Sequence, residues 1–372
     1  MYIQKIYAGI LSAILCTAVF LMPVSAADTN TESSVFYDDF SGDSLDYSKW
    51  LVASKNWGGK VEENGQLVDY NGGVIPENVS VCDGKLLLTG YGNDYEGEIR
   101  GINRDGTQRE NGKRVGAAIA AREYYASGSY EISAKIAPEI GACSAMWTFE
   151  YEEDYSSGDV KVTNHEIDIE FPGRSSEEST DYNFSSALCT TWIGENSGEY
   201  YTSYTDLGKN HADGEFHKYR FDWHTGDEEK GEEARVEFYF DDVLVYTAYD
   251  YIPTNAGRLW LGLWFPRYWA GVPGFDTTVF EIDYVKITPF NETGDTPHNE
   301  SYPDDGWAEI PVVSGDVNLD GVFSIADIVM MQKRIGGVGT LKNWYAGDFN
   351  ADNRLNVFDL SMMKHTLMSG NQ

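Results

Sequence analysis

Three carboxylates stand at alternate positions in the stretch HEIDIEFPG, which covers residues 165–173. Side chains of a β-strand alternate between the two faces of a sheet, so Glu166, Asp168 and Glu170 share one face. Like charges this close resist ionising together, and at least one pKa is expected to rise. Hydrolysis of a glycosidic bond needs one protonated and one charged carboxylate. The pattern therefore predicts that chemistry, with a solvated acidic strand face as the structural alternative.

The spacing along the strand also limits the geometry. Two residues of strand rise about 6.7 Å, which sets the Cα atoms of Glu166 and Glu170 roughly 13 Å apart. A concave sheet would bring the two carboxyl groups within about 5–6 Å, near the separation found in retaining glycosidases. Asp168 lies between them, where it can hold one glutamate and share a proton. Ile167 points to the other face and the core, and His165 is expected to be a packed histidine rather than a catalytic one.

A second acidic strand lacks the third carboxylate. In FEIDYVKI, residues 280–287, Val285 stands where the third acid would be. Two acids on a strand are common on solvated faces, so we expect a structural strand here. Asp283 is a candidate ligand of one structural calcium ion in the same domain.

The region from residue 35 to residue 290 has the pattern of an all-β domain. Short runs rich in β-branched and aromatic residues, such as GSYEISAKIAP and GRLWLGLWF, are separated by clusters of Gly, Asn and Asp. No long apolar stripe with a helical period occurs in this sequence region. About 250 residues of short antiparallel strands predict one large β-sandwich or jelly roll.

Composition excludes some classes of partner. The chain has 27 Lys plus Arg against 60 Asp plus Glu, a formal net charge of -33. Such an acidic protein repels nucleic acid and anionic membrane surfaces. The aromatic share of 14% suits sugar binding by flat rings, with core packing as the alternative.

The first residues form an export signal. Lys5 precedes an apolar run at residues 6–22, and small residues follow it. This pattern predicts a secretory signal peptide at residues 1–26, cut after Ala26. A retained membrane anchor is disfavoured because the apolar run is short for a span and ends at Pro23.

Removal of the signal leaves three cysteines, Cys82, Cys143 and Cys189. One disulfide with a free thiol and three buried thiols are both compatible with this odd number. The spacing of these residues does not resemble a metal site.

The C-terminal region contains an internal repeat. GDVNLDGVFSIADIVMMQK begins at Gly315 and GDFNADNRLNVFDLSMMK begins at Gly347, a distance of 347 minus 315, or 32 residues. Calcium binds six to eight oxygens, and alternate residues of a tight loop direct their oxygens inward. The repeat therefore predicts two calcium loops, each leading into a helix. The predicted ligands are Asp316, Asn318, Asp320, the Val322 carbonyl, Ser324 and Asp327 in the first loop, and Asp348, Asn350, Asp352, the Arg354 carbonyl, Asn356 and Asp359 in the second.

Residues 291–313 separate the two regions and are predicted to form a linker. They are polar, contain prolines and offer little apolar surface to bury.

The paired loops resemble a type I dockerin, the module that attaches cellulosomal enzymes to cohesin domains of a scaffoldin. The resemblance covers residues 314–372 and rests on Asp at loop position twelve and on the lack of a helix before each loop. It implies two bound calcium ions and a cohesin partner. The recognition positions are apolar here, Ile325-Ala326 and Val357-Phe358, which is more similar to ruminococcal dockerins than to clostridial ones.

The motif E-I-D-I-E-F-x-G resembles the signature of glycoside hydrolase family 16, in the form typical of lichenases. The similarity extends over residues 35–290. It implies a concanavalin A-like β-jelly roll with an open cleft, endo attack on β-glucans and retention of configuration. It also implies that Glu166 is the nucleophile, Glu170 the general acid/base and Asp168 the assisting carboxylate, with no cofactor for catalysis.

The same resemblance suggests which aromatic residues stack on sugars. The candidates in matching strand positions are Trp147, Phe149, Trp192 and Trp264, with core packing as the alternative for each. Three departures from the lichenase pattern concern the sugar subsites more than the chemistry. They are Asn164-His165 in place of Trp-Asp, Gly262 in place of Asn, and the loop FPRYWAGVPGFDTT.

The sequence therefore predicts a secreted, extracellular, cellulosomal endo-β-glucanase that acts on β-1,3-1,4-glucan of plant cell walls. A β-1,3-glucanase or a xyloglucan-active enzyme on the same fold is the alternative within the class. A non-catalytic, lectin-like sugar-binding module is the alternative from another class. Partners are expected to be the glucan and a cohesin, with neither nucleic acid nor membrane insertion.

Overall fold

The structure is a computed structural model, and it describes most of the chain beyond residue 34. The predicted signal peptide at residues 1–26 lies outside the described residues. None of the helices in the described part of the chain is both long and apolar enough to span a membrane. The described residues are 35–55, 60–63, 66–69, 73–92, 95, 114–154, 161–176, 178–195, 200–266, 270–299, 306–310, 313–352 and 354–370.

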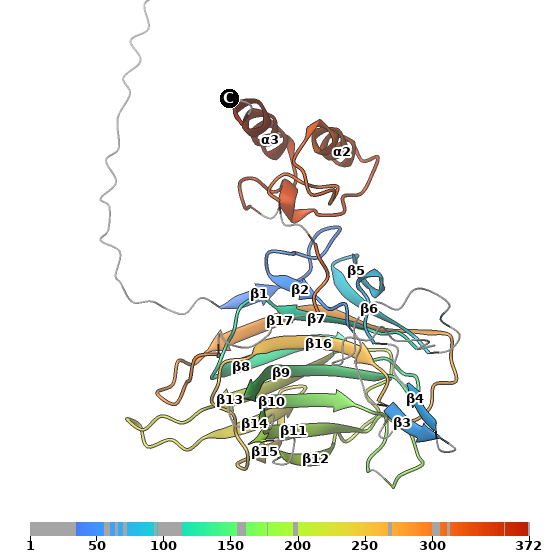
Figure 1. Cartoon of the computed structure of the whole chain (residues 1–372), viewed down its shortest axis with the longest axis vertical. Coiled ribbons are helices and arrows are strands. Elements are labelled where there is room, and N and C mark those ends of the chain that lie inside the picture. Colours follow the sequence, from blue (N-terminus) through green and yellow to red (C-terminus); the bar gives the residue numbers. More distant parts are fainter. Residues whose placement is uncertain are drawn as a thin grey trace, which may run out of the picture. The chain divides into compact units, whose positions relative to one another are not determined.

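Two antiparallel sheets form the larger part of the described chain (Figure 1). The first has eight strands in the order β15-β14-β13-β8-β17-β6-β5, with β1 paired to β17. Its strands are β1 (Phe36–Asp38), β5 (Val79–Cys82), β6 (Lys85–Tyr91), β8 (Gly128–Lys135), β13 (His217–His224), β14 (Arg235–Phe240), β15 (Val243–Ala248) and β17 (Thr277–Pro289).

The second sheet has seven strands in the order β12-β11-β10-β9-β16-β7-β2. Its strands are β2 (Trp50–Val52), β7 (Ala117–Ala121), β9 (Cys143–Asp154), β10 (Lys161–Phe171), β11 (Ser186–Glu195), β12 (Tyr200–Asp206) and β16 (Arg258–Trp264). A separate two-stranded sheet pairs β3 (Lys60–Glu63) with β4 (Gln66–Asp69).

The main core lies between the two large sheets. Alternate residues of each strand face inward, and β8 and β13 show a strictly alternating burial pattern as the period of a strand requires. In β10 the inward residues Ile167, Ile169 and Phe171 are almost fully buried. The predicted β-jelly-roll sandwich is therefore confirmed, and β10 has its acidic positions on the face away from this core.

Much of the predicted linker contacts the sandwich. Asp295 accepts hydrogen bonds from Ser127 and Thr225, and Glu292 accepts one from His224 Nδ1 at 2.6 Å. Further along, Ala308 N donates to the Val52 carbonyl at 2.8 Å. The limits 291–313 remain a prediction, but Glu292, Asp295 and Ala308 within them are hydrogen-bonded to the sandwich.

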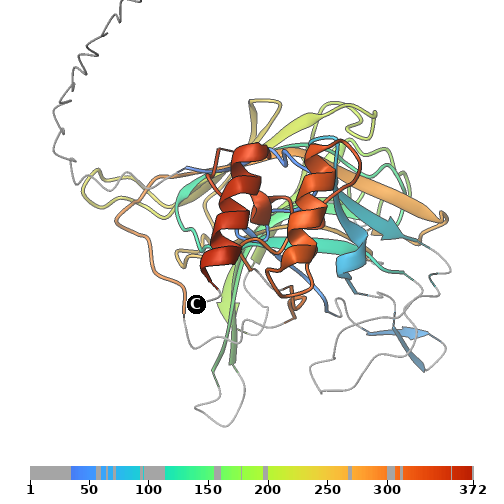
Figure 2. The same ribbon diagram turned by 90° about the horizontal axis from the view of Figure 1, so that it is seen from above.

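The C-terminal region forms two helices, α2 (Ile325–Ile335) and α3 (Val357–Ser369), which lie side by side in Figure 2. Each begins with a capping box, in which an N-cap side chain (Ser324 or Asn356) and an Asp three residues later satisfy each other's backbone N–H groups. A small core of their own holds them together. Its buried residues are Val317, Ile328, Met331, Leu341 and Met363.

The three cysteines are unpaired in the described chain. Cys143 and Cys189 are buried, whereas Cys82 is exposed. Neither alternative predicted from their number is therefore met in full, because there is no disulfide among the described residues and only two of the thiols are buried.

Candidate active site

Strand β10 is flanked on both sides by regular antiparallel neighbours. Glu166 pairs with Phe149 of β9 and with Trp192 of β11, and Asp168 pairs with Trp147 of β9. The register continues without a shift through Glu170, so the alternation of side chains is preserved. The three carboxylates therefore share the outer face of the seven-stranded sheet, as their spacing predicts.

Each carboxylate has its own hydrogen-bond donor. Trp192 Nε1 donates to Asp168 Oδ2 at 3.0 Å, and Asn164 Nδ2 donates to Glu166 Oε2 at 2.7 Å. Asp168 is also hydrogen-bonded to Glu166, and the indole of Trp264 is hydrogen-bonded to Glu170. The central Asp168 thus lies within hydrogen-bonding reach of Glu166, whereas its role as the assisting carboxylate remains a prediction.

The crowded row raises all three pKa values. Burial raises the pKa of Glu166 to about 7, although hydrogen bonds from Asp168 and Asn164 oppose the rise. Burial and the charge of Glu166 raise the pKa of Glu170 to about 8, against the hydrogen bond from Trp264. Burial and both neighbouring charges raise the pKa of Asp168 well above its usual range. Burial and mutual repulsion thus oppose ionisation of all three groups together, and each favours a protonated neighbour.

A thiol also lies beside the row. Cys143 Sγ is 4.0 Å from Glu170 Oε1, and burial followed by the charge of Glu170 raises the pKa of this thiol well above its usual range. The thiol therefore stays protonated and acts as a small, weakly polar neighbour of the carboxyl group.

The aromatic candidates differ in how much ring surface they offer. Trp192 and Trp264 are half-buried, and so is Phe149. Trp192 stacks on Tyr200 with ring centroids 4.1 Å apart. Trp147 is only 5% exposed, so it fits the alternative of packing better than that of an open sugar platform.

The position of Trp147 explains one departure from the lichenase pattern. Its ring lies over Gly262, where an added Cβ would come within 2.8 Å of the indole. A side chain at position 262 would therefore displace the ring. The ring of Trp260 stacks on Trp147 with centroids 5.6 Å apart and planes 15° apart.

Sequence reasoning missed some residues of this face. Trp260 and Cys143 have no motif of their own, although both share strand parity with recognised positions on β16 and β9. Asn164 was noted only as a departure from a pattern. Its position two residues before Glu166 is the signal that could have placed its amide beside that carboxylate.

The remaining predicted residues of the sandwich have structural surroundings. His165 is buried on the inner side of its strand, and burial lowers its pKa. Glu281 of the second acidic strand pairs with Lys135 at 3.4 Å, and β17 belongs to the other sheet. Asp283 lies at a register shift of that strand. Its proposed role as a calcium ligand remains a prediction.

The two C-terminal loops contain the oxygen donors of a cation-binding site. Asp316 accepts hydrogen bonds from the backbone N–H groups of Asp320 and Gly321, and Asp327 accepts from Asn318. Asp316, Asp327 and Asp359 have no exposed surface. Asp316 and Asp327 are thus buried in the first loop and Asp359 in the second, so the oxygen donors fit calcium, and each of the twelve predicted ligand positions belongs to a described loop.

The helix starts beside the loops are apolar and open. Ile325 is 73% exposed, Phe358 is 71% exposed and Val357 is 58% exposed. Large apolar side chains at such exposure indicate an interaction surface.

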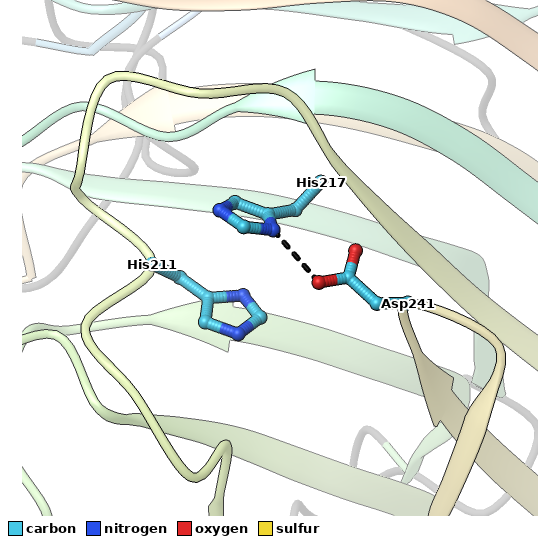
Figure 3. A group of neighbouring side chains, drawn as sticks. All are labelled: His211, His217 and Asp241. Carbon is cyan, nitrogen blue, oxygen red and sulfur yellow. Dashed lines mark hydrogen bonds and ion pairs between the residues drawn. The ribbon is translucent and has the colours of Figure 1, made fainter.

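A histidine cluster is formed by His211 of the loop after β12, His217 at the start of β13 and Asp241 of the turn between β14 and β15 (Figure 3). His217 Nδ1 is 2.9 Å from Asp241, and its Nε2 is 3.1 Å from Asp213. The rings of His211 and His217 are stacked, with centroids 4.3 Å apart. One ligand atom from each of these three residues lies within 4.8 Å of the other two, so the cluster could hold a metal ion, and its hydrogen bonds also connect His217 to the turn that carries Asp241.

Comparison with known families agrees with this geometry. Residues 92–286, more than half of the chain, match the family model described as Glycosyl hydrolases family 16. The chain belongs to glycosyl hydrolase family 16. It is thus an endo-acting glycoside hydrolase. Residues 314–368 match the model of the Dockerin type I domain, a module that typically binds calcium and a cohesin.

Similar proteins include two bacterial enzymes named Beta-glucanase. The one from Brevibacillus brevis is 29% identical over 72% of this chain and 86% of its own. The one from Acetivibrio thermocellus is 26% identical over 87% of this chain and 84% of its own.

Solved structures with a similar fold include a β-1,3-1,4-glucanase (lichenase) derived from a mouse hindgut metagenome, which is 22% identical, with a TM-score of 0.47, over 69% of this chain and all of that one. The Bacillus licheniformis β-glucanase is 21% identical, with a TM-score of 0.46, over 68% of this chain and 97% of that one.

Proposed function

We propose that the chain is an extracellular endo-β-glucanase that hydrolyses β-1,3-1,4-glucan with retention of configuration and is carried on a scaffoldin by its dockerin. The observation that supports the proposal most is the row of three carboxyl groups on the outer face of β10, in which Asp168 is hydrogen-bonded to Glu166 and to the Trp192 indole. Glu166 ionises near pH 7, whereas Glu170 keeps its proton to about pH 8. Near neutral pH the row can therefore hold a carboxylate beside protonated carboxyl groups.

The proposed reaction is a double displacement. Glu166 attacks the anomeric carbon while Glu170 gives its proton to the departing oxygen, and a glycosyl ester forms on Glu166. Glu170, now a carboxylate, then removes a proton from water, which attacks the same carbon and releases Glu166. Asp168 donates a hydrogen bond to Glu166 and is itself held by the Trp192 indole. The hydrogen bond from Asp168 orients Glu166, the nucleophile. This hydrogen bond weakens when Glu166 forms the ester.

The substrate assignment is supported by the relatives named Beta-glucanase and by the motif without an extra residue before its last glutamate. The test compares hydrolysis of barley β-glucan, laminarin and xyloglucan by the full chain. Release of reducing ends is expected to be fastest from barley β-glucan, and the first product should keep the β-anomer in a proton NMR time course. No cleavage of barley β-glucan would overturn the linkage assignment. Glucan binding without any reducing ends would favour the lectin-like alternative.

The dockerin assignment adds a partner. We expect cohesin recognition through Ile325, Val357 and Phe358, because these apolar side chains are the exposed ones at the two helix starts. Attachment through this face would keep the enzyme outside the cell in a cellulosome, and binding of the full chain to immobilised cohesins tests it. Substitution of Phe358 by Asp is expected to abolish capture by every cohesin that binds the wild type.

A further inference from the structure

Segment 306–310 continues the seven-stranded sheet at its β2 edge. Ser54 N donates to the Gly306 carbonyl at 2.7 Å, and Trp307 forms an antiparallel bridge with Ala53. Gly306 has a φ of +81°, and a Cβ there would come within 2.7 Å of the Lys55 side chain. The segment is thus fixed by backbone pairing and by a glycine that other residues replace poorly.

The bridge places the side chain of Trp307 on the same face as the carboxylates. Residues directly opposite in an antiparallel pair share a face, and Ala53 belongs to the cluster on the outer face of the sheet. Ala308, the next residue, packs against the main core instead. The small side chains of Ala53, Ala118 and Ala120 leave room for an indole above them.

Trp307 is the surface end of a stack of three indoles. Its ring centroid lies 4.8 Å from that of Trp260, with planes 28° apart, and Trp260 in turn stacks on Trp147. Trp147 and Trp260 are 5% and 4% exposed, whereas Trp307 is half-buried. The Lys55 ammonium lies 4.5 Å from the centroid of Trp260 and 5.6 Å from that of Trp307. A chain that approaches from the β2 edge therefore meets Trp307 before Trp260 and Trp147.

We propose that Trp307 is a sugar-stacking platform for a remote part of the glucan chain. The proposal rests on the function proposed above, and it moves the stacking role from Trp147 to a residue beyond Lys286, where the family match ends. Trp192 on β11 lies on one side of the carboxylates on β10. Trp260 on β16 and Trp307 lie on the other side. This continuity with the catalytic row argues for the same polysaccharide as the occupant.

Distance predicts which kinetic constant should respond. Two strand spacings of about 4.8 Å separate β10 from β16, and the Trp307 ring lies a further 4.8 Å beyond that of Trp260 on β16, so the platform is on the order of 15 Å from the carboxylates. Contacts that far from the reacting bond bind ground state and transition state alike and mainly lower KM. They also require a chain long enough to reach them.

The test compares Trp307→Leu, which keeps apolar cover over Trp260, with Trp307→Phe, which keeps a flat ring. Tyr37→Ala serves as the matched control, because Tyr37 is an exposed aromatic residue of β1 in the other sheet. For Trp307→Leu we expect about a tenfold rise in KM on barley β-glucan, kcat within about twofold, and little change on the shortest oligosaccharide that is cleaved. Trp307→Phe should regain most of the affinity, and Tyr37→Ala should equal the wild type.

Other results would overturn the proposal. A KM of Trp307→Leu equal to that of the wild type would show that the residue only packs. So would an equal rise in KM on short and long substrates, or a variant that differs from the wild type only in its melting temperature. If the wild type prefers laminarin or xyloglucan, the same comparison is made on that polymer, so the two proposals fail separately. If the wild type cleaves none of them, retention of the full-length variants in gels that contain each polymer decides whether Trp307 binds glucan.

Discussion

The two functional regions of this molecule are built in opposite ways. Each calcium loop takes all of its predicted ligands from twelve consecutive residues, 316–327 and 348–359, and its hydrogen bonds connect residues close in sequence. The carboxylate row also has local spacing, and Asn164 donates from the same strand, but two of its donors come from other strands. Trp192 belongs to β11 and Trp264 to β16. The loops therefore carry their chemistry in the local sequence, whereas the row acquires its protonation states from the assembled sheet.

The strongest test of this comparison removes the carboxylates. We expect Glu166→Gln and Glu170→Gln each to lower the release of reducing ends from barley β-glucan by about 10³-fold or more, because each removes a group that the displacement needs. Cohesin binding should not change, since the dockerin has its own core. Glu281→Gln is the matched control. It removes an acid from the other E-x-D strand and a partly exposed ion pair worth about 0–1 kcal/mol. A Glu281→Gln variant as inactive as Glu170→Gln would contradict the assignment.

Removing calcium should instead weaken cohesin binding and leave glucan hydrolysis nearly unchanged. A chelator is expected to loosen residues 314–370 and lower cohesin affinity by about 100-fold or more, because binding of the ion is coupled to folding of the loops. Hydrogen exchange of the full chain and capture by cohesin measure the two effects. The double variant Asp327→Ala/Asp359→Ala should lose cohesin binding without any chelator and keep glucan hydrolysis within about twofold. Hydrolysis lost together with binding in this variant would show that the two regions are not independent.

The dependence of the row on other strands appears in its pH profile. The value of kcat/KM should rise through about pH 7 as Glu166 ionises and fall through about pH 8 as Glu170 loses its proton. Trp264→Phe removes a donor that favours the charged form of Glu170, so the alkaline limb should move to higher pH and activity should fall about tenfold. Asn164→Ala removes a donor that favours the charged form of Glu166. This change should therefore move the acid limb of the kcat/KM profile to higher pH. Identical shifts in both variants would argue against separate donors.

The smallest expected effect is on stability. Folding raises the pKa of Glu170 above its unfolded value, so this group favours the folded state below about pH 4.5, and the contribution is lost as the pH rises through about 8. Glu170→Gln cannot ionise and should lose less stability between pH 5 and pH 8 than the wild type. Each kcal/mol of that difference corresponds to about 2–4 °C in melting temperature. If the melting temperatures of the two proteins changed equally between pH 5 and pH 8, ionisation of Glu170 would not destabilise the fold.

The sequence by itself determined the features that depend on periodicity and on local spacing. Alternation on β10 was enough to place Glu166, Asp168 and Glu170 on one face, because a strand has a period of two residues. Strand-like runs gave the sandwich, and a repeat of 32 residues gave two loops that enter capped helices.

Only the tertiary structure decided which residues meet across strands. Trp264 reaches Glu170 from another strand, Trp147 lies buried over Gly262, and Trp307 returns from the predicted linker to the edge of the sheet. These contacts join residues far apart in the chain, and their register follows from packing of the whole sandwich rather than from any local pattern. That packing sets the burial and the hydrogen bonds, and it therefore also sets the order in which the carboxyl groups lose their protons.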